Sequence, residues 1–164
     1  VYGKTKLAGE NFVREILDKY FIIRISWVFG INGHNFIKTM LSLADKGLKE
    51  INVVSDQIGS PTYTYDLSKL MCDMMVTEKY GTYHATNEGF CSWAEFASYI
   101  FKTARIDMKV NPVTTVEYKK LILNQADRPL NSKLSKQSLL DAGFSLLLSW
   151  QDAVKRFIHD ELKK

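Results

Sequence analysis

The chain has 164 residues, of which 46% are hydrophobic and 24% charged, and its formal net charge is +4. This length and composition suit a globular unit with its own core and exclude a disordered chain. No apolar run reaches the roughly 18 residues that a membrane-spanning helix needs, and no dense block of basic residues suggests a nucleic-acid surface. Cys72 and Cys91 lack metal-ligand spacing, so we expect reduced core thiols in a cytoplasmic protein, with a disulfide as the minor alternative.

Helices and strands alternate through the first half of the chain. Apolar residues at helical spacing predict helices over residues 3–19, 35–46 and 65–78, the last with Leu67, Leu70, Met71, Met74 and Met75 pointing inward. Short apolar, β-branched runs predict strands over residues 21–26, 51–54 and 82–85, with loops at 28–33 and 56–62. The run 21–26 fits a strand buried on both faces of a parallel sheet. The alternation therefore predicts an α/β fold built from βαβ units.

The second half is more irregular. Ser92 and Glu95 have capping-box spacing and predict a helix to about residue 103, with Trp93 packed in the core. Residues 109–116 look extended, and residues 127–132 form a loop. Further helices are expected over residues 135–141 and 149–163.

Tyr2 and Lys6 stand four residues apart at the start of the first predicted helix and therefore share one face of it. A neighbouring ammonium favours a phenolate, so this tyrosine could exchange a proton with a substrate oxygen. The pair indicates a keto or alcohol oxidoreductase. For the pair alone, the alternative is an ordinary helix surface with solvated lysines.

A glycine-rich dinucleotide loop is absent from the sequence, and the chain begins with Val1 rather than Met. We therefore expect the C-terminal part of a longer protein, whose remainder holds the cofactor loop. The 164 residues alone are expected to be inactive.

Several motifs, taken in order, cover essentially the whole chain. They are YGKTKLAGE at residues 2–10, RISWVFG at 24–30, DQIGSPTYT at 56–64, CSWAEFA at 91–97 and RPLNS at 128–132. In this order the chain resembles the dTDP-4-dehydrorhamnose reductases, which are extended short-chain dehydrogenases/reductases. The resemblance implies the C-terminal part of a Rossmann-like, doubly wound parallel sheet plus a small, helix-rich substrate-binding region.

Within this single C-terminal piece, the resemblance divides the residues between the two regions. Residues 1–55 and 64–87 would mainly complete the sheet and its helices. Residues 56–63 and 88–148 would mainly form the substrate-binding region, and residues 149–164 the C-terminal helix.

The resemblance also implies a reaction. Such enzymes reduce the 4-keto group of dTDP-4-dehydro-L-rhamnose to dTDP-L-rhamnose with NADPH, or sometimes NADH, for cell-surface polysaccharide. Tyr2 would donate the proton, and Lys6 would support it and bind the nicotinamide ribose. The partner would be a nucleotide sugar, a homodimer of the full-length protein stays open, and Mg²⁺ is not indicated by the sequence.

The other site residues implied by the resemblance fall in three loops. Ser26, Trp27 and Val28 would lie beside the cofactor, together with Tyr2 and Lys6. Substrate contacts would come from Trp27, Asn35, Gln57, Ser60, Pro61, Thr62 and Arg128. Three of these have a structural alternative: a core position for Trp27, a simple turn for residues 56–62, and an ion pair of Arg128 with Asp127 or another carboxylate.

Two departures from the family pattern leave the substrate open. Phe29 stands where a tyrosine is common, and Asp127 precedes Arg128 and would weaken its attraction for a diphosphate. Another NDP-sugar reductase or an epimerase of the same family remains an alternative. A non-catalytic, nucleotide-binding regulatory subunit is a third, against which the intact Tyr2 and Lys6 argue.

Overall fold

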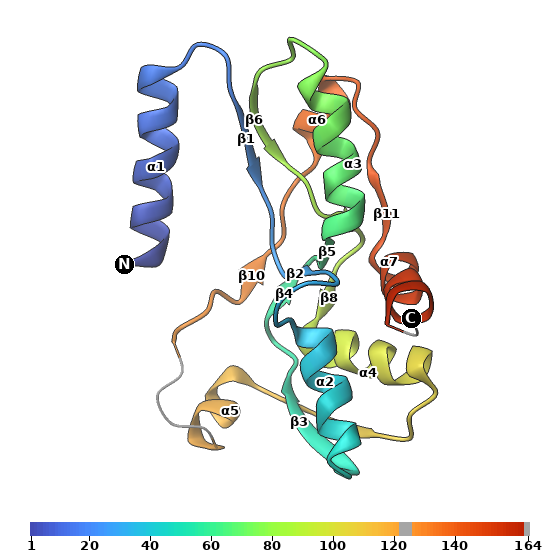
Figure 1. Ribbon diagram of the computed structural model, residues 1–164. Coiled ribbons are helices and arrows are strands. Elements are labelled where there is room, and N and C mark those ends of the chain that lie inside the picture. The colour runs from blue at the N-terminus through green and yellow to red at the C-terminus, as the bar shows by residue number, and fades with distance from the viewer. Residues whose placement is uncertain (122–125, 163–164) are drawn as a thin grey trace.

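The computed structural model describes residues 1–121 and 126–162 and shows an α/β chain arranged as two regions (Figure 1). Each region has its own cluster of buried hydrophobic residues. Short strands join the two regions, and two clefts open near these strands. None of the described helices combines the length and apolar character that a bilayer crossing requires.

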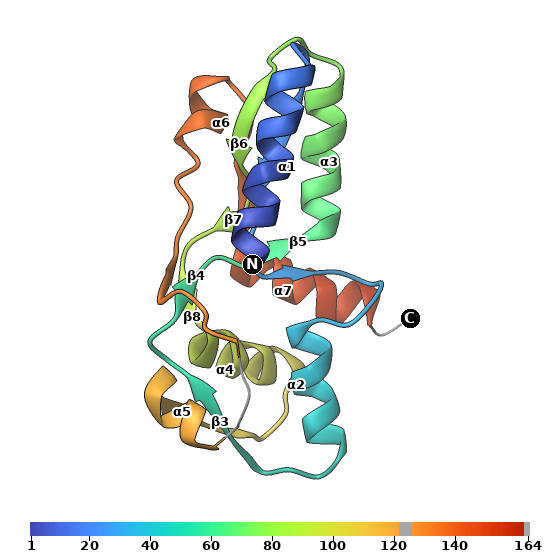
Figure 2. The ribbon, with the colours of Figure 1, turned by 90° about the vertical axis from the view of Figure 1, so that its left-hand side faces the viewer.

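The first region is a small parallel sheet with helices on both faces. Strand β1 (Phe21–Arg24) pairs in parallel with β6 (Gly81–His84). Helix α1 (Tyr2–Ile16) lies on one face, and α3 (Thr64–Met75) and α6 (Gln137–Asp141) lie on the other (Figures 1 and 2). All four residues of β1 are only half-buried, so the prediction of burial on both faces is wrong. Among the described residues β1 pairs with β6 alone, and α1 buries no residue against it.

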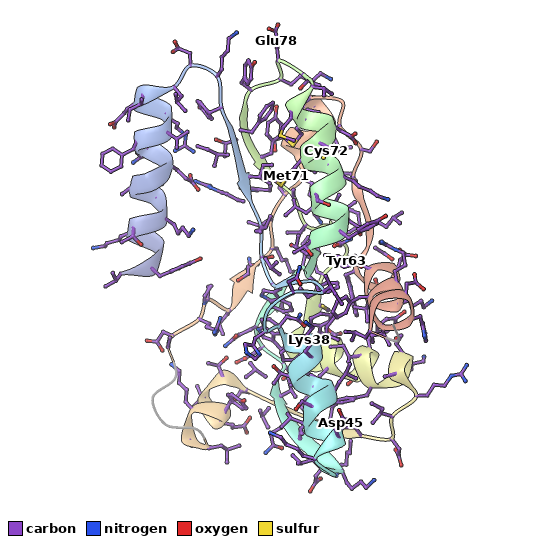
Figure 3. All side chains as sticks on the ribbon, viewed as in Figure 1. Lys38, Asp45, Tyr63, Met71, Cys72 and Glu78 are labelled. Carbon is purple, nitrogen blue, oxygen red and sulfur yellow. The ribbon has the colours of Figure 1, made fainter. Side chains whose placement is uncertain are left out.

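Helix α3 packs through a narrower face than its sequence predicts. Leu67, Leu70 and Met74 are buried at the spacing of one helical stripe. Met71 and Met75 lie beside that stripe, with 41% and 67% of their surface exposed, so the expectation that they point inward is wrong. Cys72 is also exposed and not a core thiol (Figure 3).

The second region is built on β3 (Glu50–Val54) and β9 (Lys109–Val113), which pair in parallel over all five residues. Helices α2 (Phe36–Asp45) and α4 (Trp93–Ala104) pack with them around the larger buried cluster. Asn35 caps α2 through the Lys38 amide, and Gly47 follows the helix at φ 84°.

The extended run predicted to reach residue 116 ends earlier. Helix α5 (Thr115–Leu121) begins directly after β9. The Thr114 amide and hydroxyl donate to the Glu117 carboxylate, and the Glu117 amide donates back to the Thr114 hydroxyl. This reciprocal capping of the helix start explains why the chain turns there.

Very short strands occupy segments that the sequence predicts as loops. Strand β2 (Val28–Phe29) pairs with β5 (Thr62–Tyr63), and β4 (Ile58–Gly59) lies between β8 (Cys91–Ser92) and β10 (Asn131–Ser132). Strand β7 (Asn87–Glu88) pairs with β11 (Leu147–Ser149). Two or three residues are too few to show a strand periodicity, so these strands have no sequence signal.

The chain ends in a helix that changes character. Helix α7 (Trp150–Arg156) begins at the Ser149 cap, and a π-helical segment (Phe157–Glu161) continues it. The predicted helical end at Lys163 lies outside the described residues.

Candidate active site

A cleft of about 710 Å³ opens at the carboxyl end of β1, between the first turns of α1 and the loop that leads into β10. Ligands of open α/β sheets bind at this end of the strands. Its lining includes many of the residues that the sequence predicts for a site: Tyr2, Lys6, Ser26, Trp27, Val28, Gln57 and Arg128. The cleft therefore gathers segments from the start, middle and end of the chain.

Tyr2 and Lys6 lie in the first turns of α1 and both line the cleft. The Lys6 Nζ atom is 6.0 Å from the centroid of the Tyr2 ring, so the ammonium and the phenol are neighbours. Both side chains are exposed, which leaves them accessible to a ligand in the cleft. The arrangement supplies a proton donor and a positive charge side by side.

Glu10 continues the same face of α1 and is held by Arg24 at the end of β1. The Arg24 Nε atom donates to Glu10 Oε1 at 2.8 Å, and Arg24 Nη2 donates to Oε2 at 2.6 Å. These hydrogen bonds hold the pKa of the Glu10 carboxyl below its ordinary value. No local pattern predicts the pairing of Glu10 with Arg24. The four-residue spacing of Tyr2, Lys6 and Glu10 does place Glu10 on the same helix face as the other two.

The turn after β1 presents Trp27 to the cleft in an unusual backbone conformation. Trp27 has a φ of 48°, in the left-handed region that non-glycine residues rarely occupy. The Thr62 amide donates to the Trp27 carbonyl at 3.1 Å, and the Thr62 hydroxyl donates to the Ser26 carbonyl at 2.6 Å. The Ser26 hydroxyl donates to the Ser60 carbonyl at 2.7 Å. Three hydrogen bonds thus fix this turn.

Ser60, Pro61 and Thr62 were expected to form a wall of the substrate pocket. The structure buries all three, and none of them lines the cleft. The Ser60 hydroxyl donates to the Gly89 carbonyl at 2.6 Å instead. Their observed contacts support the Ser26–Trp27 turn from behind, because buried hydroxyls must find partners in the protein.

Trp93 packs, partly buried, against the larger core cluster, as predicted, and it also lines the cleft beside Trp27. The two indoles are stacked, with ring centroids 3.7 Å apart and planes 14° from parallel. Trp93 is the first residue of α4 and directly follows the Ser92 cap, which fixes where the helix begins. No local pattern could have paired it with Trp27, which is distant in sequence.

Gln57 and Asn35 occupy different places. Gln57 is buried at the floor of the cleft, and its Nε2 atom donates to the Thr115 hydroxyl at 3.0 Å. Asn35 does not line the cleft; its amide Nδ2 donates to the Gly30 carbonyl at 2.9 Å while its oxygen caps α2. The observed contacts of Asn35 are those of a helix cap.

Arg128 lies where the cleft meets a smaller pocket of about 340 Å³, and Gln57 and Trp93 border both spaces. Asp127 pairs with Lys119, not with Arg128. Among the described side chains of residues 1–121, 126–160 and 162, no carboxylate lies within 4.0 Å of the Arg128 guanidinium. Its donors therefore remain available for an anionic ligand.

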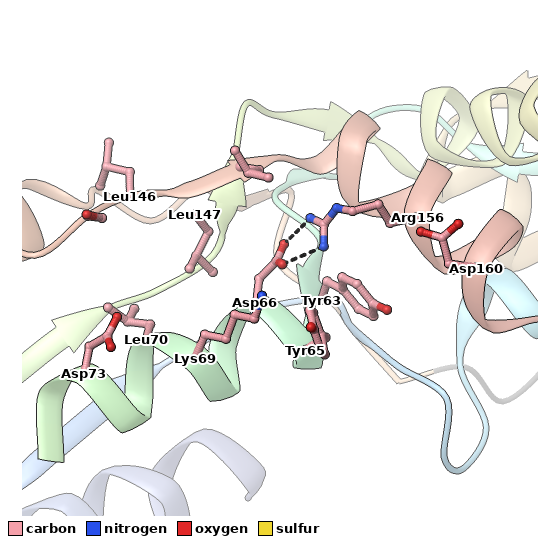
Figure 4. Close-up of a pocket in the computed structure, with 12 residues that line it drawn as sticks. Tyr63, Tyr65, Asp66, Lys69, Leu70, Asp73, Leu146, Leu147, Arg156 and Asp160 are labelled. Carbon is pink, nitrogen blue, oxygen red and sulfur yellow. Dashed lines mark hydrogen bonds and ion pairs between the residues drawn. The ribbon is translucent and has the colours of Figure 1, made fainter.

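A second cleft of about 680 Å³ lies beside α3, β11 and α7 (Figure 4). Its central charges satisfy one another: Arg156 Nη1 and Nη2 donate to the Asp66 carboxylate at 2.8 and 2.7 Å. Asp66 also accepts from the buried Asn87 amide, so the group ties α3, α7 and β7 together. None of the predicted site residues lines this cleft, and we read its ion pair as structural.

A metal centre has no support in the part of the chain that the structure describes. There, no group of three or more histidine, cysteine, aspartate or glutamate side chains is placed to hold an ion.

Comparison with known proteins identifies one family. The model of the RmlD substrate binding domain matches residues 1–163. The Bacillus subtilis spore coat polysaccharide biosynthesis protein SpsK is 40% identical over 160 residues, which cover 98% of this chain and 54% of that protein. A dTDP-4-dehydrorhamnose reductase from Aggregatibacter actinomycetemcomitans is 40% identical over 168 residues, covering 94% of this chain and 55% of that protein. The chain thus spans about half the length of these relatives.

Solved structures agree with this comparison. The dTDP-4-dehydrorhamnose reductase from Bacillus anthracis, in complex with NADP, has a TM-score of 0.87 at 45% identity and covers 96% of this chain and 54% of that one. The Clostridium acetobutylicum reductase has a TM-score of 0.91 at 42% identity and covers 99% of this chain and 56% of that one.

Proposed function

The chain belongs to the RmlD substrate-binding domain family, and from this premise we propose that it forms the substrate side of an NADPH-dependent dTDP-4-dehydrorhamnose reductase. The reaction would convert the 4-keto group of dTDP-4-dehydro-L-rhamnose into the hydroxyl of dTDP-L-rhamnose. The observation that carries the proposal is the placement of Tyr2 and Lys6 on one cleft with Trp27. The similarity to solved dTDP-4-dehydrorhamnose reductases, one of them in complex with NADP, supports the same assignment.

The side chains at the mouth of the cleft suit a nicotinamide nucleotide. Lys6 offers an exposed ammonium for ribose hydroxyls, and residues 26–28 form the wall at the carboxyl end of β1. When bound, a reduced nicotinamide supplies the hydride that reaches the carbonyl carbon. NADPH is proposed because a solved relative holds NADP.

Tyr2 acts on the other side of the carbonyl group. As the carbon–oxygen π electrons move onto oxygen, the Tyr2 hydroxyl gives its proton to that oxygen and becomes a phenolate. The Lys6 ammonium, 6.0 Å from the ring centroid, stabilises the phenolate by its charge. The products are a secondary alcohol and a tyrosinate that regains its proton from solvent, which the exposure of Tyr2 allows.

The remainder of the cleft would hold the nucleotide sugar. The flat indole of Trp27 suits the apolar face of a deoxysugar ring. The Arg128 guanidinium has no carboxylate partner among the described side chains, and its planar fork suits a diphosphate better than a lysine would. Gln57 would contact the substrate through the carbonyl oxygen that its bond to Thr115 leaves available.

The test is turnover by the natural full-length protein. Loss of NADPH absorbance is followed with dTDP-4-dehydrorhamnose and with a panel of other 4-keto sugars carried on dTDP, UDP and GDP. The proposal expects the highest kcat/KM for the dTDP-rhamnose precursor. A higher value for another nucleotide keto-sugar would reassign the substrate, and no turnover with any of them would reject the reductase.

A further inference from the structure

Trp27 is held in a conformation that its own backbone does not favour. Its φ of 48° lies in the left-handed region, where a side chain is strained. Such a conformation persists only where surrounding contacts over-determine it. The hydrogen bonds from Ser26 and Thr62 restrain the backbone, but they leave the torsions of the indole free.

Two neighbours restrict the indole itself. Trp93 lies flat against it at 3.7 Å between ring centroids. Gly59 approaches the same indole so closely that a Cβ atom there would be 2.7 Å from Trp27 Cε2 and 2.9 Å from Cζ2. All the heavy atoms closest to that Cβ position belong to Trp27, so the missing side chain at Gly59 is what makes room for the ring.

Gly59 and Trp93 are themselves joined by one short ladder. Gly59 on β4 pairs with Cys91 on β8, two residues before Trp93. The Ser92 amide donates to the Glu95 carboxylate at 2.7 Å, and the Glu95 amide donates to the Ser92 hydroxyl at 3.1 Å, which fixes the first turn of α4. The ladder and the capping box therefore set the positions of both neighbours relative to Trp27.

We propose that Trp93 and Gly59 form a clamp that holds the Trp27 indole in place at the cleft wall, so that Trp93 is a positioning residue for substrate recognition. This inference rests on the proposed function, because it assumes that Trp27 contacts the sugar. Tyr2 and Lys6 lie on α1 and not on the clamp, so loss of the clamp weakens substrate binding more than the proton transfer.

The experiment measures kinetics and circular dichroism of the natural full-length protein and four variants. Trp93→Ala removes the ring that stacks on Trp27, and Trp93→Phe keeps a smaller aromatic ring there. Gly59→Ala adds a methyl group that collides with the Trp27 indole. Trp150→Phe is the control, because the indole of Trp150 packs on Phe96 and Tyr99 and does not line the cleft. Two stacked indoles couple their transitions and give a pair of bands of opposite sign.

Trp93→Ala is expected to raise KM for the keto-sugar about tenfold, the size of one aromatic contact, with kcat changed less than about threefold. Trp93→Phe should recover most of that loss. Gly59→Ala should also raise KM and should alter the paired circular-dichroism bands. Both Trp93 variants should abolish these bands. Trp150→Phe should leave the KM and the paired bands unchanged.

The clamp would be overturned if Trp93→Ala and Gly59→Ala both fold, both change the paired circular-dichroism bands, and both keep a KM within about twofold of the wild-type value. Thermal unfolding of each variant shows whether it is folded, and Gly59→Ala decides the matter should Trp93→Ala not fold. Absence of turnover in the wild type rejects the proposed function instead, so the two failures are distinguishable.

Discussion

Arg24 at the end of β1 binds Glu10 on α1 through two hydrogen bonds, of 2.8 Å from Nε and 2.6 Å from Nη2. Glu10 lies on the same face of the helix as Tyr2 and Lys6, and all of them line the cleft. Because α1 buries none of its residues within the described chain, this pair is a main link between the helix and the sheet. It therefore sets how the proposed proton donor faces the turn that carries Trp27.

Replacing Glu10 by Gln should loosen that link and lower the rate of reduction. Without the second charge-assisted hydrogen bond the first turns of α1 are held less firmly, and a small displacement of a reacting group is costly. We expect kcat to fall about threefold to tenfold, with a fall in the unfolding temperature at neutral pH of only about 1–4 °C. The matched control is Glu15→Gln, an exposed glutamate on the same helix that does not line the cleft. Equal kcat values for the two variants would contradict a positioning role.

The same pair makes a small part of the stability depend on pH. The Arg24 hydrogen bonds lower the pKa of Glu10 in the folded state, so the pair stabilises the fold fully above the unfolded value of about 4.3. This contribution is lost as the pH falls through the lower, folded pKa. The difference in Tm between the wild type and Glu10→Gln should therefore shrink below about pH 4 and be constant above about pH 6. A difference that grows on acidification would have the wrong sign.

Arg128 is predicted to act on substrate affinity. Arg128→Ala should raise KM for the nucleotide sugar about tenfold to a hundredfold while kcat changes little, because a bidentate contact to a diphosphate is lost. Arg128→Lys should restore only part of the affinity, since an ammonium cannot fork onto two oxygens. Asp127→Asn is the control: Asp127 pairs with Lys119, so its loss should leave KM near the wild-type value. An unchanged KM in Arg128→Ala would remove the assigned contact.

The two cysteines should differ sharply in reactivity. Cys91 has 2% of its surface exposed, and burial together with the nearby Glu95 carboxylate raises its pKa to about 12. Cys72 is exposed on α3. Iodoacetamide at about pH 8 should therefore modify Cys72 readily and Cys91 only after unfolding in urea, as read by peptide mass mapping. Equal rates in the folded protein would argue against the burial of Cys91.

Local patterns predicted most of the long elements. The periodicity of residues 65–78 located α3, and Ser92 with Glu95 located the start of α4. The errors lie where a neighbour distant in sequence decides the outcome. Met71 and Met75 fit the helical pattern, but the layer beneath α3 covers only the stripe of Leu67, Leu70 and Met74.

The candidate site shows the same limit. Tyr2 and Lys6 could be paired by helical spacing alone, and the structure places both on one cleft. The support of the Ser26–Trp27 turn by Ser60 and Thr62 could not be predicted, because those hydrogen bonds span more than thirty residues of sequence. The stacking of Trp93 on Trp27 was missed for the same reason, since it depends on the β4–β8 ladder.

The most direct measurement is the rate of keto-sugar reduction by the full-length protein carrying Tyr2→Phe, which removes one hydroxyl oxygen from the cleft and keeps the ring beside Lys6. Loss of the proton donor should lower kcat by about two to four orders of magnitude. The dissociation constant of NADPH should stay within about twofold of the wild-type value, since the hydroxyl serves the substrate oxygen. A wild-type rate in this variant would contradict the assignment of Tyr2 as the proton donor and remove the mechanism proposed for this cleft.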